Sequence, residues 1–317
     1  MYVTSPQRCI WWEAPLAGAS FSWNTSTYIQ RAGTSYYLAS LFFPHALKQR
    51  IFLLYAFVRI ADDIVDQPAY PEMEQAINQV HQYAQHVYHR QPTGENSLLT
   101  TQQQEIVMHA VDMLRSYMVP REWIDAFFIA MKADTTSVRM HTYQELQRYM
   151  YGSAEVIGRM VVQLYGTELE VPAQQRMPLA AKLGEAMQYT NFLRDVGEDY
   201  GELWRIYMPS ERLARHQLTH EDIATYTTTK TVDGRWQAYM QDEVRFAREL
   251  YAQAQPWIAY LPADMRTAVA LAAQLYENIL DRIVYQQYNV FARPARTTAY
   301  NKATTIGKFF LSRIWWR

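Results

Sequence analysis

The 317-residue sequence has few of the features that mark several common classes of protein. Its one cysteine, Cys9, excludes an intrachain disulfide framework and a multi-cysteine zinc site, and it fits a reducing compartment. A formal net charge of −1 argues against nucleic acid as a partner. The sequence lacks a run of eighteen apolar residues and a basic start followed by an apolar core, so we expect neither a transmembrane helix nor a secretion signal. These absences predict a cytoplasmic protein.

Glycine is also scarce, with 11 residues, and this composition suits long helices. There is no glycine-rich loop of the dinucleotide-binding or Walker type, which favours a redox-neutral reaction. Hydrophobic residues make up 49% of the sequence, which is enough for a core and a cavity, and no linker rich in Gly, Ser or Pro divides the chain. We therefore expect one large all-α domain.

The spacing of apolar residues predicts a helical bundle without a strand meander. One predicted helix carries Gly152 and Gly158, and a glycine inside a helix costs about 1 kcal/mol relative to alanine. This cost indicates the close approach of another helix or a ligand, or a kink. The predicted helices cover residues 45–66, 71–89, 101–118, 121–134, 142–165, 178–200, 233–260 and 262–287.

Two acidic motifs lie inside otherwise apolar helical sequence, YAFVRIADDIVDQ and QYTNFLRDVGEDY. Burying several carboxylates is costly unless cations neutralise them, so we expect a cation between the two segments. The oxygen ligands predicted for it are Asp62, Asp63, Asp66, Asn191, Asp195 and Asp199.

Residues three or four positions apart share one face of a helix. Tyr55 and Arg59 therefore lie on the stripe of the first motif, while Gln188 begins the stripe of the second, with Arg194 on its flank. Such columns of oxygen ligands suit Mg²⁺, with Mn²⁺ as a second candidate, carrying the phosphate oxygens of a substrate. Guanidinium groups match phosphate geometry, so Arg59, Arg194 and Arg205 are candidate phosphate contacts. The motifs predict metal-dependent chemistry on a diphosphate inside a helical bundle.

At these motifs the sequence resembles the squalene/phytoene synthase family of head-to-head prenyl transferases, from about residue 33 to about residue 293. Five blocks occur in the family's order, and the two acidic ones are the most specific. The blocks are GTSYYLASLFFP, YAFVRIADDIVD, YMYGSAEVIG, QYTNFLRDVGEDYGELWRIYMP and LYENILDRIVYQQYNVF. Residues 1–32 have no counterpart in the family pattern. We therefore expect an N-terminal extension over 1–32 and a single isoprenoid synthase domain over 33–317.

The resemblance implies a helical bundle around a central apolar cavity in which two prenyl diphosphates bind with Mg²⁺. One diphosphate ionises to an allylic cation, and the second substrate attacks it to give a cyclopropyl diphosphate. A second ionisation and a rearrangement then give the hydrocarbon. The final base implied is either the released pyrophosphate or a tyrosine.

Individual residues take roles from the resemblance, position by position. Asp62, Asp66, Asp195 and Asp199 resemble the metal ligands, and Asn191 resembles a member of the second metal site. The candidate catalytic residues are Tyr55, Arg59, Arg194, Tyr207 and Tyr276. The candidate substrate contacts are Ser35, Tyr36, Arg59, Asp134, Tyr149, Gln188, Arg194, Arg205 and Arg293.

One departure from the family pattern lies beside Ser35. Many members carry a lysine next to this serine, whereas the run here is Gly33-Thr34-Ser35. The corresponding diphosphate contact is therefore neutral or is supplied from elsewhere in the chain.

The resemblance is strongest to the phytoene synthase branch, which implies the joining of two geranylgeranyl diphosphates without NADPH. One alternative is a C30 synthase that makes squalene, dehydrosqualene or presqualene diphosphate from farnesyl diphosphate. Another is a non-catalytic protein that binds prenyl lipids or assists assembly. The sequence leaves chain length, product stereochemistry and oligomeric state open.

The C-terminal run GKFFLSRIWWR mixes basic and aromatic residues. This mixture is typical of a helix at a membrane interface, and a lipid-soluble product would suit peripheral membrane contact. The alternative is a helix that packs on the domain.

Overall fold

The computed structural model describes residues 38–66, 72–92, 98–165 and 173–314. Within these ranges the regular structure is helical, with an isolated β-bridge between Arg139 and Ile206, so the all-α prediction is confirmed. The helices are α3 (His45–Val65), α4 (Met73–Tyr88), α5 (Thr101–Ser116), α6 (Arg121–Ala133), α7 (Tyr143–Met150), the π-helix η1 (Tyr151–Glu155), α8 (Val156–Tyr165), α9 (Ala173–Leu203), α10 (Ser210–Ala214), α11 (His220–Thr229), α12 (Gly234–Tyr260), α13 (Ala263–Tyr285) and α14 (Ala299–Ile314).

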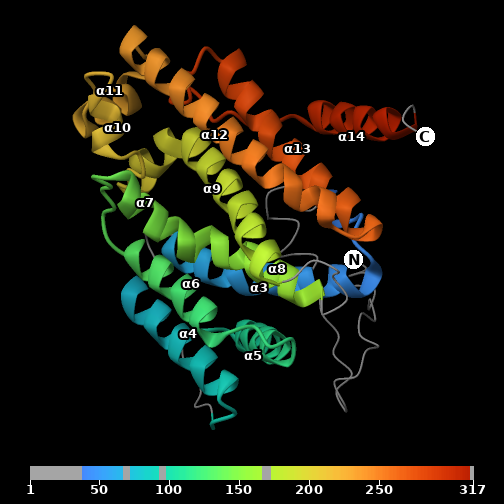
Figure 1. Ribbon diagram of the computed structural model, residues 1–317. Helices are drawn as coiled ribbons and strands as arrows, with labels where there is room; N and C mark the ends of the chain where they lie inside the picture. The colour runs from blue at the N-terminus through green and yellow to red at the C-terminus, as the bar shows by residue number, and fades with distance from the viewer. Residues whose placement is uncertain (1–37, 67–71, 93–97, 166–172, 315–317) are drawn as a thin grey trace, which may run out of the picture.

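Helix α9 runs through the middle of the bundle (Figure 1). It packs against α12 and α13 on one side and against α8 and η1 on another, while α3 packs against α4, α5, α6 and α8. Its buried residues are distributed around several faces, among them Ala181, Tyr189, Phe192 and Leu193, as expected of a helix enclosed by neighbours. Helix α9 therefore brings the second acidic motif into the interior, where the first motif on α3 can face it.

The two glycines of the 142–165 segment lie where helices touch through their backbones. A Cβ atom at Gly152 would lie 2.3 Å from the carbonyl oxygen of Ala126, and one at Gly158 would lie 2.7 Å from that of Ala180. The expected close approach of other helices is thus confirmed. The π-helical turn η1 interrupts the helix at the first of these contacts.

The two ends of α9 differ most from the prediction, while the other predicted boundaries lie within one or two residues of the observed ones. Helix α9 begins at Ala173 instead of residue 178, and it continues past residue 200 to Leu203. Pro178 is its sixth residue, so the ring removes one hydrogen bond near the end of a long, well-packed helix, which packing can offset. Tertiary contacts therefore override the local breaker signal.

Helix α14 (Ala299–Ile314) contains the described part of the C-terminal run, and it packs on the domain. Asn278 Nδ2 on α13 donates a hydrogen bond to Thr305 Oγ1 at 2.6 Å. Ile306 and Phe309 pack against a small apolar cluster made by Ala39 with three residues of α13, Leu271, Ala272 and Leu275. Across the described residues, each helix is either too short or too polar to cross a membrane.

Candidate active site

A cavity of about 380 Å³ lies between α3, α6, η1, α8, α9, α12 and α13. Its lining changes character along both motif helices. On α3 the lining residues run from Leu54 and Val58 to Asp62 and Asp66, and on α9 they run from apolar residues such as Leu183 to the acidic motif. The cavity therefore has an apolar end and a polar end, which is the arrangement expected for a ligand with a hydrocarbon tail and a charged head.

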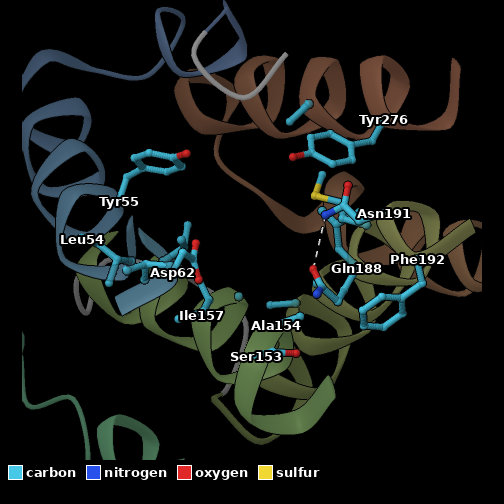
Figure 2. A pocket seen from close by; sticks show the side chains of 18 of the residues that line it. Leu54, Tyr55, Asp62, Ser153, Ala154, Ile157, Gln188, Asn191, Phe192 and Tyr276 are labelled. Carbon is cyan, nitrogen blue, oxygen red and sulfur yellow. Dashed lines mark hydrogen bonds between the residues drawn. The ribbon is translucent and has the colours of Figure 1, made fainter. Parts of the chain in front are cut away.

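Figure 2 shows the two motif helices and α13 presenting their side chains to this space. Tyr55 and Asp62 lie on one side, and Tyr276, Asn191 and Gln188 lie on the other. The tyrosine hydroxyl groups of Tyr55 and Tyr276 point toward each other across the cavity. Burial raises the pKa of both tyrosines, so they remain protonated at neutral pH.

The first acidic motif divides between the cavity and its rim. Asp62 and Asp66 line the cavity. Burial and the neighbouring charge of Asp66 raise the pKa of Asp62 to about 8. Arg59 and Asp63 are not among the lining residues; they form an ion pair at 2.6 Å, and each side chain is about a third exposed. The structure therefore places these two predicted site residues beside the cavity.

The second acidic motif contributes a continuous column, since Gln188, Asn191, Asp195 and Asp199 all line the cavity. Asn191 Nδ2 donates to Gln188 Oε1 at 3.3 Å, whereas Asn191 Oδ1 is buried and accepts no hydrogen bond from the described residues. Burial and the charges of Asp195 and Asp66 raise the pKa of Asp199 well above its usual value. A buried acceptor without a donor and carboxylates that repel each other are features that a cation would relieve.

Arginines partly neutralise the polar end. Arg194 Nε donates to Asp195 Oδ1 at 2.7 Å. Arg194 itself is not among the lining residues. Arg205, on the chain that follows α9, lines the cavity and donates to Asp66 Oδ1 at 3.1 Å and to the carbonyl oxygen of Val65. Arg205 thus ties the end of the second motif to the end of the first.

A buried carboxylate and two tyrosines form the adjoining wall. Asp134 accepts hydrogen bonds from the hydroxyl groups of Tyr149 at 2.6 Å and Tyr207 at 2.8 Å. Burial raises the pKa of Asp134 to about 6, although Arg205 and both hydrogen bonds favour its charged form. The Tyr207 ring stacks on Phe192 with 4.4 Å between centroids. Residues far apart in the sequence therefore join in one rigid aromatic surface of the cavity.

The remaining predicted residues lie elsewhere. Arg293 is exposed and does not line the cavity. Ser35 and Tyr36, together with the predicted extension over 1–32, lie outside the described residues. The sequence did not single out the apolar lining, which includes Trp257, Met265 and Val269, because such residues carry no signal that separates them from core packing.

The donor set fits a hard divalent cation. Asp62, Asp66, Asn191, Asp195 and Asp199 could hold it, and all five offer oxygen atoms, which Mg²⁺ and Mn²⁺ prefer. Within the described ranges, no three acidic or histidine side chains converge into a ready-made chelate. The residues therefore suit a cation that is shared between the protein and the oxygen atoms of a ligand.

Comparisons with known proteins agree with this arrangement. A family profile described as squalene/phytoene synthase matches residues 29–301. The chain is 31% identical over 292 residues to a phytoene synthase of Thermus thermophilus, covering 92% of this chain and 93% of that one. It is 28% identical over 285 residues to a 15-cis-phytoene synthase of Synechococcus elongatus, covering 87% and 88%.

Solved structures share the fold. A dehydrosqualene synthase in complex with a ligand superposes with a TM-score of 0.74 at 23% identity, covering 91% of this chain and 94% of that one. A squalene synthase from Alicyclobacillus acidocaldarius gives a TM-score of 0.69 at 21% identity, covering 84% and 93%. The predicted isoprenoid synthase bundle is confirmed by these two superpositions.

Proposed function

The chain belongs to the squalene/phytoene synthase family, and is thus a prenyl transferase; from this premise we propose that it joins two geranylgeranyl diphosphates head to head to give phytoene. The observation that carries the proposal is the two-ended cavity. The column of Gln188, Asn191, Asp195 and Asp199 faces Asp62 and Asp66 at one end, and apolar side chains line the other. A diphosphate with a long hydrocarbon chain matches both ends.

The polar end would bind and orient the two diphosphates. A divalent cation bound there, Mg²⁺ or Mn²⁺, supplies the positive charge that makes a diphosphate a better leaving group. Arg205 and Arg194 add fixed guanidinium groups that match phosphate oxygens. The family depends on divalent metals in general. Asn191 Oδ1 accepts no hydrogen bond from the described residues, which supports a role for Asn191 as a metal ligand.

The middle and apolar end of the cavity would protect the allylic cation. Water must be excluded there, because it would quench the cation. The stacked rings of Phe192 and Tyr207, with Tyr149 beside them at 5.1 Å from Tyr207, offer aromatic faces. Attraction of a cation to such faces contributes about 2 kcal/mol when both are desolvated.

The proton lost in the last step needs a base. Burial raises the pKa of Tyr55, Tyr149, Tyr207 and Tyr276, so these side chains stay protonated. Of the two candidate bases, the released pyrophosphate is therefore favoured over a tyrosine. The tyrosines would position the substrate rather than accept its proton.

The C40 product is supported by the curated relatives, which are named phytoene synthases. A C30 product from farnesyl diphosphate remains the alternative, because the cavity chemistry suits either chain length. We propose that no NADPH is needed. In the non-catalytic alternative, the complete set of oxygen ligands would only bind a prenyl lipid and would take no part in a reaction.

The decisive experiment is incubation of the purified full chain with Mg²⁺ and either geranylgeranyl or farnesyl diphosphate, with and without NADPH, followed by analysis of the hydrocarbons. A C40 triene from geranylgeranyl diphosphate without NADPH is expected. A C30 product alone would move the assignment to the C30 branch. Absence of product from either substrate, in protein shown to be folded, would favour a binding role.

We also propose that the enzyme is cytoplasmic and touches a membrane peripherally through the outer face of α14. Leu311 is 57% exposed there, and Lys308 is exposed on the same helix. The Phe310 ring lies at an angle to the Phe42 ring with 5.3 Å between centroids, next to the exposed Leu41, and this contact extends the apolar surface. Basic and apolar side chains together suit a bilayer that contains anionic lipid.

Flotation with phosphatidylglycerol vesicles tests this contact. Leu311→Asp is expected to weaken binding about tenfold, since a leucine buried in an apolar environment contributes about 1.5–3 kcal/mol. Ile129→Asp on α6 is the matched control, because Ile129 is a comparably exposed apolar residue on a different helix. Equal loss in both variants, or none in either, would exclude α14 as the contact.

A further inference from the structure

Two stretches of chain beside the cavity are held together by their backbones. Arg205 and Tyr207 follow α9, and both line the cavity. Ile206, between them, pairs with Arg139 in the isolated β-bridge, and its amide donates to the carbonyl oxygen of Val138 at 2.9 Å. The direction in which the two cavity residues leave the backbone therefore depends on the segment around Arg139.

Trp204, the residue directly before Arg205, has a strained backbone. Its φ is 58°, in the left-handed region that a bulky side chain rarely adopts and that glycine usually occupies at the end of a helix. Trp204 is 62% exposed, so burial of its ring offsets little of this strain. A conformation of this kind persists only where neighbouring groups fix it.

Arg139 supplies that constraint. Its Nη1 atom donates to the carbonyl oxygen of Trp204 and, at 2.7 Å, to that of Val138. Its guanidinium carbon lies 5.5 Å from the ring centre of Tyr200, in the last turn of α9. A charged donor makes a stronger hydrogen bond than a neutral one. Arg139 thus joins the end of α9, the strained residue and the bridged segment.

The peptide group between Trp204 and Arg205 is held on both sides. Arg139 binds its carbonyl oxygen, and its amide, the N–H of Arg205, donates to the carbonyl oxygen of Asp199 at 3.0 Å. Because a peptide group is planar, these two hydrogen bonds fix the plane from which the Arg205 side chain starts. That side chain reaches Asp66 Oδ1, at the end of α3, at 3.1 Å. Arg139 itself is not among the lining residues, so its influence on the cavity passes through Arg205.

We propose that Arg139 is a positioning residue for Arg205: it fixes the Trp204–Arg205 peptide group, so that the Arg205 guanidinium is already in place when a diphosphate enters the cavity. The proposal rests on the proposed function, in which Arg205 contacts a diphosphate. A side chain that is held in position beforehand loses less conformational freedom on binding, and the affinity for the diphosphate is higher for that reason.

A double-mutant cycle tests this assignment, with calorimetric titration of the full chain by inorganic pyrophosphate in excess Mg²⁺ as the measurement. Arg205→Met removes the phosphate contact, and the dissociation constant should rise about tenfold or more. Arg139→Met alone should raise it about fivefold. In the Arg205→Met background the same change should have no further effect, because the side chain that Arg139 positions is gone. A residue that only stabilises the fold would not show this dependence on Arg205.

Arg235→Met is the matched control. Arg235 Nη1 donates at 2.7 Å to the carbonyl oxygen of Gln217, which has the same left-handed φ of 58°, and neither residue lines the cavity. Its loss should leave the dissociation constant unchanged. Arg139→Gln keeps an N–H donor, and the same cycle is run with it if Arg139→Met does not fold.

The outcomes that would overturn the assignment are distinct. If Arg139→Met binds pyrophosphate like the unaltered protein, or if its loss multiplies that of Arg205→Met in the double variant, Arg139 does not act through Arg205. If Arg205→Met itself binds normally, or the unaltered protein binds no pyrophosphate, there is no contact for Arg139 to position. The proposed function is judged separately, by the hydrocarbon that the unaltered protein makes, so a failed cycle beside a C40 product removes only the role of Arg139.

Discussion

Helix α9 contributes to two polar clusters that the protein treats in opposite ways. Tyr189 does not line the cavity, and its hydroxyl group donates to Glu243. Arg212 Nε donates to both carboxylate oxygens of Glu243, at 3.0 and 3.1 Å, and its guanidinium lies 4.5 Å from the ring centre of Phe246. We call Tyr189, Arg212 and Glu243 the clamp. Its charges cancel within the chain.

The cavity cluster of Asp62, Asp66, Asp195 and Asp199 is left incomplete by contrast. Carboxylates raise one another's pKa there, and the acceptor of Asn191 has no donor among the described residues. Tyr189 of the clamp is the neighbour of Gln188, which lines the cavity. Helix α9 therefore contributes to the two clusters from different faces. A cluster whose charges and hydrogen bonds are paired within the chain stabilises the fold. A cluster whose carboxylates repel each other and whose acceptor has no donor is instead suited to binding a cation.

The largest expected effect is on turnover in the cavity cluster. Asp199→Asn and Asp62→Asn should each lower kcat by about 10³-fold, because several kcal/mol of charge stabilisation at the leaving group depend on the bound metal. The melting temperature should stay level or rise, since one of several repelling charges is removed. Product formation measured with Mg²⁺ and thermal melting measured without metal check the two parts. A large fall in melting temperature would show that these carboxylates stabilise the fold, as the clamp does, and would contradict the prediction.

The clamp should show the reverse pattern, with stability lost and chemistry spared. Arg212→Met leaves Glu243 buried and unpaired, so the free energy of unfolding should fall by about 3–5 kcal/mol. Arg248→Met is the control, because the Arg248–Asp281 pair is exposed and should contribute about 1 kcal/mol or less. Urea unfolding measures both variants.

A double variant tests whether the clamp contributes to stability and not to turnover. Combining Arg212→Met with Glu243→Leu removes both charges and should recover part of the lost stability. Turnover per folded molecule should change only a few-fold in the single variant below its melting temperature. If Arg212→Met instead abolishes turnover while remaining stable, the clamp belongs to the catalytic machinery and the contrast between the clusters is wrong.

The sequence could predict the helices and the acidic columns because both depend on spacing within one helix. It could not tell which members of a column face the cavity: Arg59 and Asp63 satisfy the spacing yet pair with each other at 2.6 Å beside it. That choice depends on how α3 is rotated against its neighbours. The clamp could not be predicted either, because Arg212 and Glu243 lie on different helices and neither belongs to a recognisable sequence motif. Likewise, only the fold joins Asp134 to Tyr207.

The last comparison is a pH dependence of stability that the carboxyl groups around the cavity should produce and the clamp should not. The pKa of Asp62 is raised to about 8 and that of Asp134 to about 6, whereas an unfolded aspartate titrates near 4. Between these values the folded state binds more protons than the unfolded state. In the metal-free protein, the contribution of these two carboxyl groups to the free energy of unfolding should therefore fall as pH rises from about 4 to about 8.

Three comparisons, each by urea unfolding across this pH range, localise the effect. Asp62→Asn should reduce the slope, because that group no longer takes up a proton. Mg²⁺ with pyrophosphate should also flatten it, since a bound cation favours the ionised carboxylates and releases their protons. The double variant Arg212→Met with Glu243→Leu, which removes both charges of the clamp, should shift the whole curve and leave its slope unchanged. If the slope changed in this double variant and ignored both Asp62 and the metal, the pH dependence would come from the clamp and not from the carboxylates around the cavity.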